Sequence, residues 1–214
     1  MAENTRIPKP YQVLLEAGQA EIVEKKSRFI AYLAKCESEK EATDFIEMIK
    51  KKHWDARHNC SAFVIGDSAQ LTRCSDDGEP AGTAGRPMLE VLLGSGVRNV
   101  AVVVTRYFGG VLLGTGGLVR AYSQAVKEAL DVSKIGTMQY GYRLKITTDY
   151  NGIGKILYLL GQRSIEPYES DYGENVSLGI LVPYDEKESL CKEIIEATLG
   201  KAQIEKLQEE FFVV

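Results

Sequence analysis

The residues with the clearest capacity for chemistry lie in a glycine-rich segment, Arg106–Tyr122, with the sequence RYFGGVLLGTGGLVRAY. The segment passes from a strand pattern through a glycine turn into a helical pattern. Glycines bend freely and expose backbone N–H groups, and a helix N-terminus adds partial positive charge. This combination predicts a phosphate-binding loop. The alternative is that the glycines only allow tight strand–helix packing. Under either interpretation we expect a side chain at Gly116 to be harmful, through a positive φ or a blocked approach.

Known phosphate motifs fit this segment poorly. A Walker A loop places Lys after its last glycine, whereas Thr115 follows Gly114 here. A dinucleotide-binding fingerprint requires glycine where Val119 stands. Anion binding is therefore predicted from loop chemistry and not from a motif.

A second segment, Ser75–Arg86, carries three carboxylates within four residues: Asp76, Asp77 and Glu79. Carboxylates spaced this closely suit a hard cation such as Mg²⁺. Asp, Gly and Pro are also the residues that turns use. A long loop without secondary structure is more often functional than a short one. We therefore predict ligand contact here, and neither a bound metal nor another cofactor.

His53, His58, Cys60 and Cys74 could supply four zinc ligands, but their spacing matches no familiar zinc finger or knuckle. The only tryptophan, Trp54, follows a basic stretch. Stacking on a nucleic-acid base is one interpretation. A half-buried anchor is the interpretation that we favour.

The glycine-rich and acidic segments must be positioned by an α+β chain of two domains, 1–135 and 136–214. Ser38 and Glu41 fit a capping box at the start of the first helix, and Pro87 suits the first position of a later one. Beyond a joint at 131–139, the order is β-α-β-β-α-β, as in ferredoxin-like domains. The weakest assignment is the last strand, because Glu205–Glu210 could pass for a helix. The expected elements are strands at 16–23, 27–34, 60–66, near 70–74, 99–108, 140–148, 165–170, 176–182 and within 202–213, and helices at 38–51, 88–93, 118–130, 152–161 and 186–199.

Net charge and cysteine content limit the partners and the cellular compartment that we expect for the protein. The net charge is −4, which argues against strong non-specific attraction to nucleic acid. Residues 138–214 hold 8 Lys and Arg against 13 Asp and Glu, so any nucleic-acid contact is expected in the first part. Four cysteines without a C-x-x-C pair indicate free thiols. With no secretory apolar region and no run long enough for a bilayer, we expect a cytoplasmic protein.

Three segments together resemble the signature blocks of the Impact family: Arg57–Phe63, Ser75–Gly85 and Arg106–Tyr122. Gly154-Lys155 and Asp171–Glu174 resemble the small domain that follows in its bacterial YigZ-type members. The resemblance implies a first domain with the two-layer α/β fold of a ribosomal small-subunit protein, the fourth domain of elongation factor G and the GHMP kinases. It implies a ferredoxin-like second domain, as in the last domain of elongation factor G.

Eukaryotic members of this family regulate translation by restraining a starvation-sensing kinase through its activator, using a separate N-terminal module. The few residues before the first expected strand leave no room for that module, so we do not expect the eukaryotic partner here. Some relatives have Lys where this chain has Leu112, which weakens phosphate binding as a role shared by the family.

The sequence favours a non-enzymatic binding factor that contacts RNA, the ribosome or another translation component. It leaves open an enzyme for a small phosphorylated metabolite, with His58 as its base, and a protein-interaction adaptor using the acidic second domain. The ligand, any reaction, the oligomeric state and the domain orientation are not predicted. The candidate ligand or phosphate contacts are Arg57, His58, Asp76, Asp77, Glu79, Thr83, Arg106, Gly109, Gly110, Gly114, Thr115, Gly116, Gly117 and Arg120.

Overall fold

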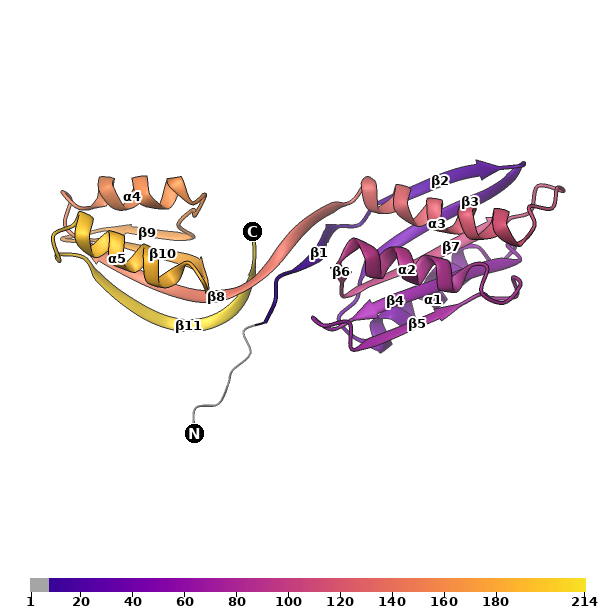
Figure 1. The fold of residues 1–214 in the computed structure, drawn as a ribbon, viewed down its shortest axis with the longest axis horizontal. Helices are drawn as coiled ribbons and strands as arrows, with labels where there is room; N and C mark the ends of the chain where they lie inside the picture. The colour runs from indigo at the N-terminus through magenta and orange to yellow at the C-terminus, as the bar shows by residue number, and fades with distance from the viewer. Residues whose placement is uncertain (1–7) are drawn as a thin grey trace, which may run out of the picture. The chain divides into compact units, whose positions relative to one another are not determined.

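A computed structural model describes residues 8–214 of the chain (Figure 1). The backbone contacts divide it into an N-terminal unit, Tyr11–Thr137, and a C-terminal unit made of residues 8–10 and Met138–Val214. The boundary that the sequence predicts, between residues 135 and 136, lies within strand β8 (Lys134–Thr148). The segment expected to be a joint is therefore partly strand, and β8 begins six residues earlier than predicted.

The N-terminal unit is built on a five-stranded antiparallel sheet in the order β2-β3-β7-β4-β5. Its central strand is β7, which holds the all-apolar run Val100–Val104. These residues are fully buried, because helices cover both faces of the sheet. A strand that is apolar along its whole length is typical of such a central, buried position. The strands of this unit are β1 (Tyr11–Glu16), β2 (Gln19–Glu24), β3 (Ser27–Lys35), β4 (His58–Ile65), β5 (Leu71–Ser75), β6 (Val97–Arg98) and β7 (Val100–Tyr107).

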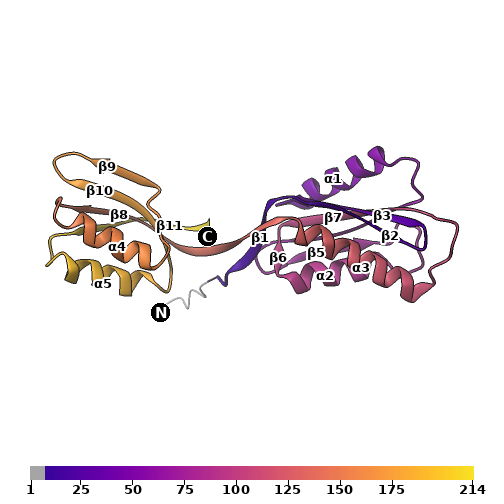
Figure 2. The same ribbon diagram turned by 90° about the horizontal axis from the view of Figure 1, so that it is seen from above.

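Helices α2 (Gly85–Ser95) and α3 (Thr115–Asp131) pack on one face of this sheet and enclose the larger core. These helices and the sheet form the two layers that the resemblance implies, and a further helix adds a third layer. Helix α1 (Glu39–Lys52) covers the opposite face (Figure 2). The predicted capping box opens α1, since the Glu41 N–H donates to Ser38 Oγ at 3.2 Å and the Ser38 hydroxyl donates to the Glu41 carboxylate.

Two predicted elements of this unit are wrong in their limits. The strand expected at 16–23 is interrupted, because Gly18 packs against α3 and donates its N–H to Ser133 Oγ at 2.8 Å. Strand β1 therefore ends at Glu16, and it pairs with β6 instead. Helix α2 begins at Gly85, so Pro87 is its third residue and not its first.

The C-terminal unit has the predicted β-α-β-β-α-β order and the mixed α+β fold is confirmed. Its antiparallel sheet runs β11-β8-β10-β9, and both helices lie on one face (Figures 1 and 2). Residues 205–210, which could pass for a helix, pair with β8 as part of β11. After β8, the elements are α4 (Ile153–Gln162), β9 (Glu169–Tyr172), β10 (Val176–Pro183), α5 (Lys187–Ala197) and β11 (Gln203–Val213).

Across residues 8–214, no helix combines the length and apolar character that crossing a membrane requires.

The turn after β7 depends on Gly109. A Cβ there would overlap the backbone of Lys26 and Ser27, and the Gly109 N–H donates to Ser27 Oγ at 3.1 Å. We expect Gly109→Ala to lower the free energy of unfolding by at least about 1–3 kcal/mol, because the backbone of Lys26 and Ser27 cannot move aside as a flexible side chain can. Urea unfolding followed by circular dichroism measures the difference.

Gly116→Ala is the matched control. Gly116 lies in the first turn of α3 without a positive φ, and a Cβ there meets nothing within 4 Å. The positive φ expected for Gly116 is therefore wrong. We expect this variant to be neutral or more stable by up to about 1 kcal/mol. Equal losses in the two variants would contradict the close approach at Gly109.

Candidate functional site

A buried ion pair joins the two segments that the sequence singles out. Arg106 Nη1 lies 2.7 Å from Glu79 Oε1, and the two side chains are only 6% and 3% exposed. Tyr122 of α3 donates its hydroxyl to the same carboxylate oxygen at 2.8 Å. The Arg106 guanidinium also lies over the rings of Phe29 and Phe108. Strand β7, the acidic loop and α3 are thereby held together at one point.

The acidic loop is organised by Asp76. Its carboxylate accepts the backbone N–H groups of Gly82, Ala84 and Gly85 at 2.8–3.0 Å, so it caps the start of α2. Burial acts to raise the pKa of this carboxyl, but the three N–H donors together hold the pKa below its ordinary value. Asp76 therefore stabilises the turns of the loop, which is the alternative to metal binding that the sequence leaves open.

Asp77 and Glu79 have separate partners. Asp77 accepts the Asn59 N–H at 2.7 Å and pairs with Lys50 at 3.2 Å, while its carbonyl accepts from His58 Nδ1 at 2.9 Å. The Glu79 carboxylate pairs with Arg106 and accepts the hydroxyl of Tyr122. Within residues 8–214, no three His, Cys, Asp or Glu side chains form a group that could hold a metal ion. The geometry therefore does not support a cation shared by the three carboxylates.

A cavity of about 430 Å³ lies between the acidic loop and the glycine turn, and we call it the Arg106 cavity. Its polar lining comes from Arg57, His58, Glu79, Arg106 and Thr115. Its apolar lining comes from Pro80, Phe108, Leu112, Leu113 and Leu118. The cavity thus combines a few cationic and polar groups with an apolar wall, as small-ligand sites do.

The N-terminus of α3 lies at this cavity. Gly114 precedes the helix with φ 74° and ψ 166°, a conformation that suits glycine. Among the described residues, no side chain caps this end. The N–H groups of Thr115, Gly116 and Gly117 therefore have no intrahelical acceptor. Such an end attracts anions.

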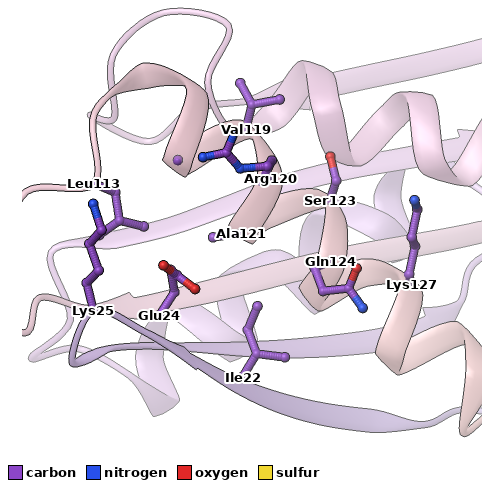
Figure 3. Close-up of a pocket in the computed structure, with 11 residues that line it drawn as sticks. Ile22, Glu24, Lys25, Leu113, Val119, Arg120, Ala121, Ser123, Gln124 and Lys127 are labelled. Carbon is purple, nitrogen blue, oxygen red and sulfur yellow. The ribbon is translucent and has the colours of Figure 1, made fainter.

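A second depression lies along the side of α3, and we call it the α3 groove (Figure 3). It has a volume of about 420 Å³. Arg120 and Lys127 extend from α3, with Ser123 and Gln124 between them, and Lys25 comes from the turn after β2. Glu24 also lines the groove, which leaves a surplus of two positive charges.

The structure brings six of the fourteen predicted contacts together on the Arg106 cavity and places the other eight elsewhere. Asp76, Asp77 and Thr83 shape the acidic loop, and Gly109 and Gly110 form the turn after β7. Gly117 and Arg120 line the α3 groove, and Gly116 is exposed on α3. Those that line the Arg106 cavity are Arg57, His58, Glu79, Arg106, Gly114 and Thr115.

The arginines that flank these segments fall into two groups. Arg73 pairs with Glu39, Arg86 with Glu90 and Arg106 with Glu79. In the part of the chain that the structure describes, Arg57 and Arg120 have no acidic partner, and both are exposed. Of the five arginines that flank the signature segments, these two can contact an external anion without first breaking an internal ion pair.

Sequence reasoning missed Lys25 and Lys127, which belong to the α3 groove. Lys127 was within reach of the sequence, because residues 120, 123, 124 and 127 share one helical face. Lys25 was not, since its position depends on how the β2–β3 hairpin packs beside α3.

The half-buried anchor expected at Trp54 is wrong, because its side chain is 83% exposed at the end of α1. The nearby His53 is buried between two tyrosines, with Tyr32 Oη at 2.7 Å and Tyr107 Oη at 2.9 Å. Burial lowers the pKa of His53. It is therefore not placed with Cys60 or Cys74 as a zinc ligand.

Known proteins resemble this chain over both of its units. Residues 25–130 match the Impact N-terminal domain, and residues 146–201 match a domain of unknown function, DUF1949. The IMPACT family member YvyE of Bacillus subtilis is 43% identical over 92% of this chain and 90% of its own length. The IMPACT family member YigZ of Escherichia coli is 41% identical over 92% of this chain and 98% of its own length.

A crystal structure of a hypothetical protein shares 37% identity with the chain, with a TM-score of 0.59 over 94% of this chain and 99% of the other. These matches define a two-domain protein with an Impact-type N-terminal domain. The chain belongs to the IMPACT family, and the resemblance inferred from its signature segments is confirmed.

The buried ion pair predicts that replacing Arg106 and replacing Arg120 have very different effects on the free energy of unfolding. Arg106→Ala leaves Glu79 buried without its counterion, so we expect a loss of about 3–5 kcal/mol in the free energy of unfolding. Arg120→Ala removes an exposed, unpaired charge and should change it by no more than about 0.5 kcal/mol. Urea unfolding followed by circular dichroism compares the two. Similar losses would contradict the assigned role of Arg106.

The Asp76 cap predicts a pH dependence. Asp76→Asn leaves one accepting oxygen for three N–H donors, so we expect it to lower the free energy of unfolding at pH 7 by about 1–2 kcal/mol. Because the folded pKa of Asp76 is lowered, its contribution is complete above the unfolded pKa of about 3.9 and is lost as the pH falls through the folded value. The difference between wild type and variant should narrow below about pH 4. A difference that does not change with pH would argue against the charged cap.

Proposed function

We propose that the protein is a binding factor for RNA or for an RNA-containing translation component, and that its N-terminal unit supplies the contact. The observation that carries the proposal is the set of unpaired cations on the α3 groove: Lys25, Arg120 and Lys127. None of the three pairs with an acidic side chain among residues 8–214. Unpaired exposed cations bind phosphate without first breaking an internal ion pair.

The spacing along α3 suits a nucleic-acid backbone. Arg120 and Lys127 are seven residues apart on one helical face, which corresponds to a rise of about 10 Å. Phosphates of one strand in a duplex follow one another at about 3.4 Å along the axis, so the two side chains contact different phosphates. Ser123 and Gln124 lie between them and can donate hydrogen bonds to the backbone.

Family membership supports the same proposal. The sequence resemblance implies that eukaryotic members act on translation, and that the first domain shares its fold with a ribosomal protein and an elongation-factor domain. Contacts made by these cations position a backbone and carry no sequence information. Recognition is therefore expected to follow RNA shape and charge, and to be weak to moderate.

The test is the salt dependence of binding. Labelled transfer RNA and ribosomal subunits are titrated with the protein at low and physiological salt. Each phosphate contact contributes a slope of about −0.7 to −0.9 in log affinity against log salt concentration. We expect Arg120→Ala combined with Lys127→Ala to reduce the magnitude of that slope by about 1.4 to 1.8, with the melting temperature unchanged.

A double variant with the same change in net charge is the control. Arg73→Ala with Arg86→Ala removes two exposed arginines that are paired with Glu39 and Glu90. We expect it to leave the slope near the wild-type value. Absence of binding at both salt concentrations, or equal effects of the two double variants, would reject RNA binding through the α3 groove.

A further inference from the structure

Arg106, which lines the Arg106 cavity, has a buried donor that lacks an acceptor. Arg106 pairs with Glu79 through Nη1, whereas its Nε–H has no hydrogen-bond partner within residues 8–214. The residue is 94% buried and lines the cavity. A buried donor without a partner carries a desolvation cost of about 1–3 kcal/mol, and more when the group is charged. An anion that accepted a hydrogen bond from this N–H would remove that cost.

A second, independent set of donors lies in the same cavity. Thr115 stands at the uncapped N-terminus of α3, a helix of 17 residues. The backbone N–H groups of its first turn and the Thr115 hydroxyl are available to an anion. Arg57, exposed and unpaired in the described part of the chain, lies on the same lining. Charge-assisted hydrogen bonds of this kind are the strong ones in anion binding.

His58 also lines the cavity, and its two ring nitrogens differ in their hydrogen bonding. Its Nδ1 donates to the Asp77 carbonyl at 2.9 Å. The ring orientation is thereby set, and Nε2 is left without a partner among the residues described. The ionisable and charged groups on the cavity lining are Arg57, His58, Glu79 and Arg106, and with His58 neutral they leave one positive charge.

The wall of the cavity that completes this lining is apolar. Phe108 and Leu112 are 45% and 82% exposed, which is high for side chains of this size. They join Leu113 and Leu118 on the lining. A flat or apolar organic group placed against Phe108 would bury this surface, and aromatic rings offer a stacking face. A volume of about 430 Å³ falls in the range of small-ligand sites.

We infer that the Arg106 cavity binds a terminal phosphate monoester that carries a flat or apolar organic group, the chemistry shared by a free nucleoside monophosphate and a 5′-phosphorylated RNA end. The phosphate lies between Arg106, Arg57 and the start of α3, and the organic group lies against Phe108 and Leu112. This site is separate from the α3 groove and does not depend on the function proposed for that groove.

The first test is calorimetric titration with adenosine 5′-monophosphate, adenosine and inorganic phosphate at one ionic strength. We expect adenosine 5′-monophosphate to bind at least tenfold more tightly than either of the others, because only it supplies both the phosphate and the flat group. Equal affinity for adenosine would overturn the phosphate contact. Equal affinity for inorganic phosphate would overturn the contact with the apolar wall.

Thr115→Pro is the variant designed to keep the fold. Proline is favoured at the first position of a helix, and the ψ of 166° at Gly114 is close to what a residue before proline requires. The change removes one N–H and one hydroxyl from the cavity. We expect at least a tenfold loss of affinity for adenosine 5′-monophosphate with no loss of thermal stability. Arg73→Ala is the control and should bind as the wild type does. An unchanged affinity in Thr115→Pro would reject the site.

Glu79→Gln gives an effect of opposite sign. Glutamine keeps an oxygen for Tyr122 and Arg106 but removes the negative charge. Arg106 then lacks a counterion, so we expect a lower melting temperature without ligand, and a larger rise on adding adenosine 5′-monophosphate than in the wild type. A role of Glu79 in folding alone would lower the melting temperature without enlarging the ligand response, which would contradict the proposal.

The two histidines provide an internal comparison in solution. His58 lines the Arg106 cavity, whereas His53 lies between Tyr32 and Tyr107 on the α1 face of the sheet. We expect adenosine 5′-monophosphate to move the imidazole nuclear magnetic resonance signals of His58 and to leave those of His53 in place. Movement of neither, or of both equally, would count against binding in this cavity.

A last comparison separates the two sources of the phosphate. One short oligoribonucleotide is titrated with a 5′-phosphate and with a 5′-hydroxyl. If the phosphorylated form binds more tightly, and Thr115→Pro abolishes the difference, the cavity takes an RNA end. If only the free nucleotide responds to Thr115→Pro, it takes a small molecule. If neither responds, the inference is wrong, whatever the salt slope of the α3 groove proves to be.

Discussion

The N-terminal unit depends on one buried charge pair. Arg106 comes from the central strand, Glu79 from the acidic loop, and Tyr122 on α3 donates to the same carboxylate. A buried pair of this kind contributes little net stability by itself, but either charge left alone is costly. The pair therefore acts as a constraint: the loop, the strand and the helix must meet in one arrangement, and the Arg106 cavity exists because they do.

Much of the fold could be predicted from local pattern. The apolar run of β7, the capping box at Ser38 and the element order of the C-terminal unit all follow from residues close together in the chain. The errors arose where a distant residue decides. Helix α2 begins at Gly85 because Asp76, nine residues earlier, caps it, and the first strand ends where Gly18 meets Ser133, 115 residues away.

The candidate site was predicted less completely, for the same reason. Residue types identified the two loops, and the structure places six of the fourteen predicted contacts on one cavity. Residue types could not separate the arginines, because pairing is a property of the folded chain: Glu79 is 27 positions from Arg106 and Glu39 is 34 positions from Arg73. When the five arginines are sorted by ion pair, and not by nearness to a signature segment, Arg57 and Arg120 are the two without an acidic partner in the described part of the chain.

The exposure of Trp54 has a consequence for spectroscopy. It is the only tryptophan of the chain and its side chain is already 83% in solvent. Its indole emission in the folded state should therefore resemble that of the unfolded chain, with a maximum at long wavelength and ready quenching by iodide. Intrinsic tryptophan fluorescence will therefore respond to a partner that binds at the end of α1. It will change little when the hydrophobic cores unfold.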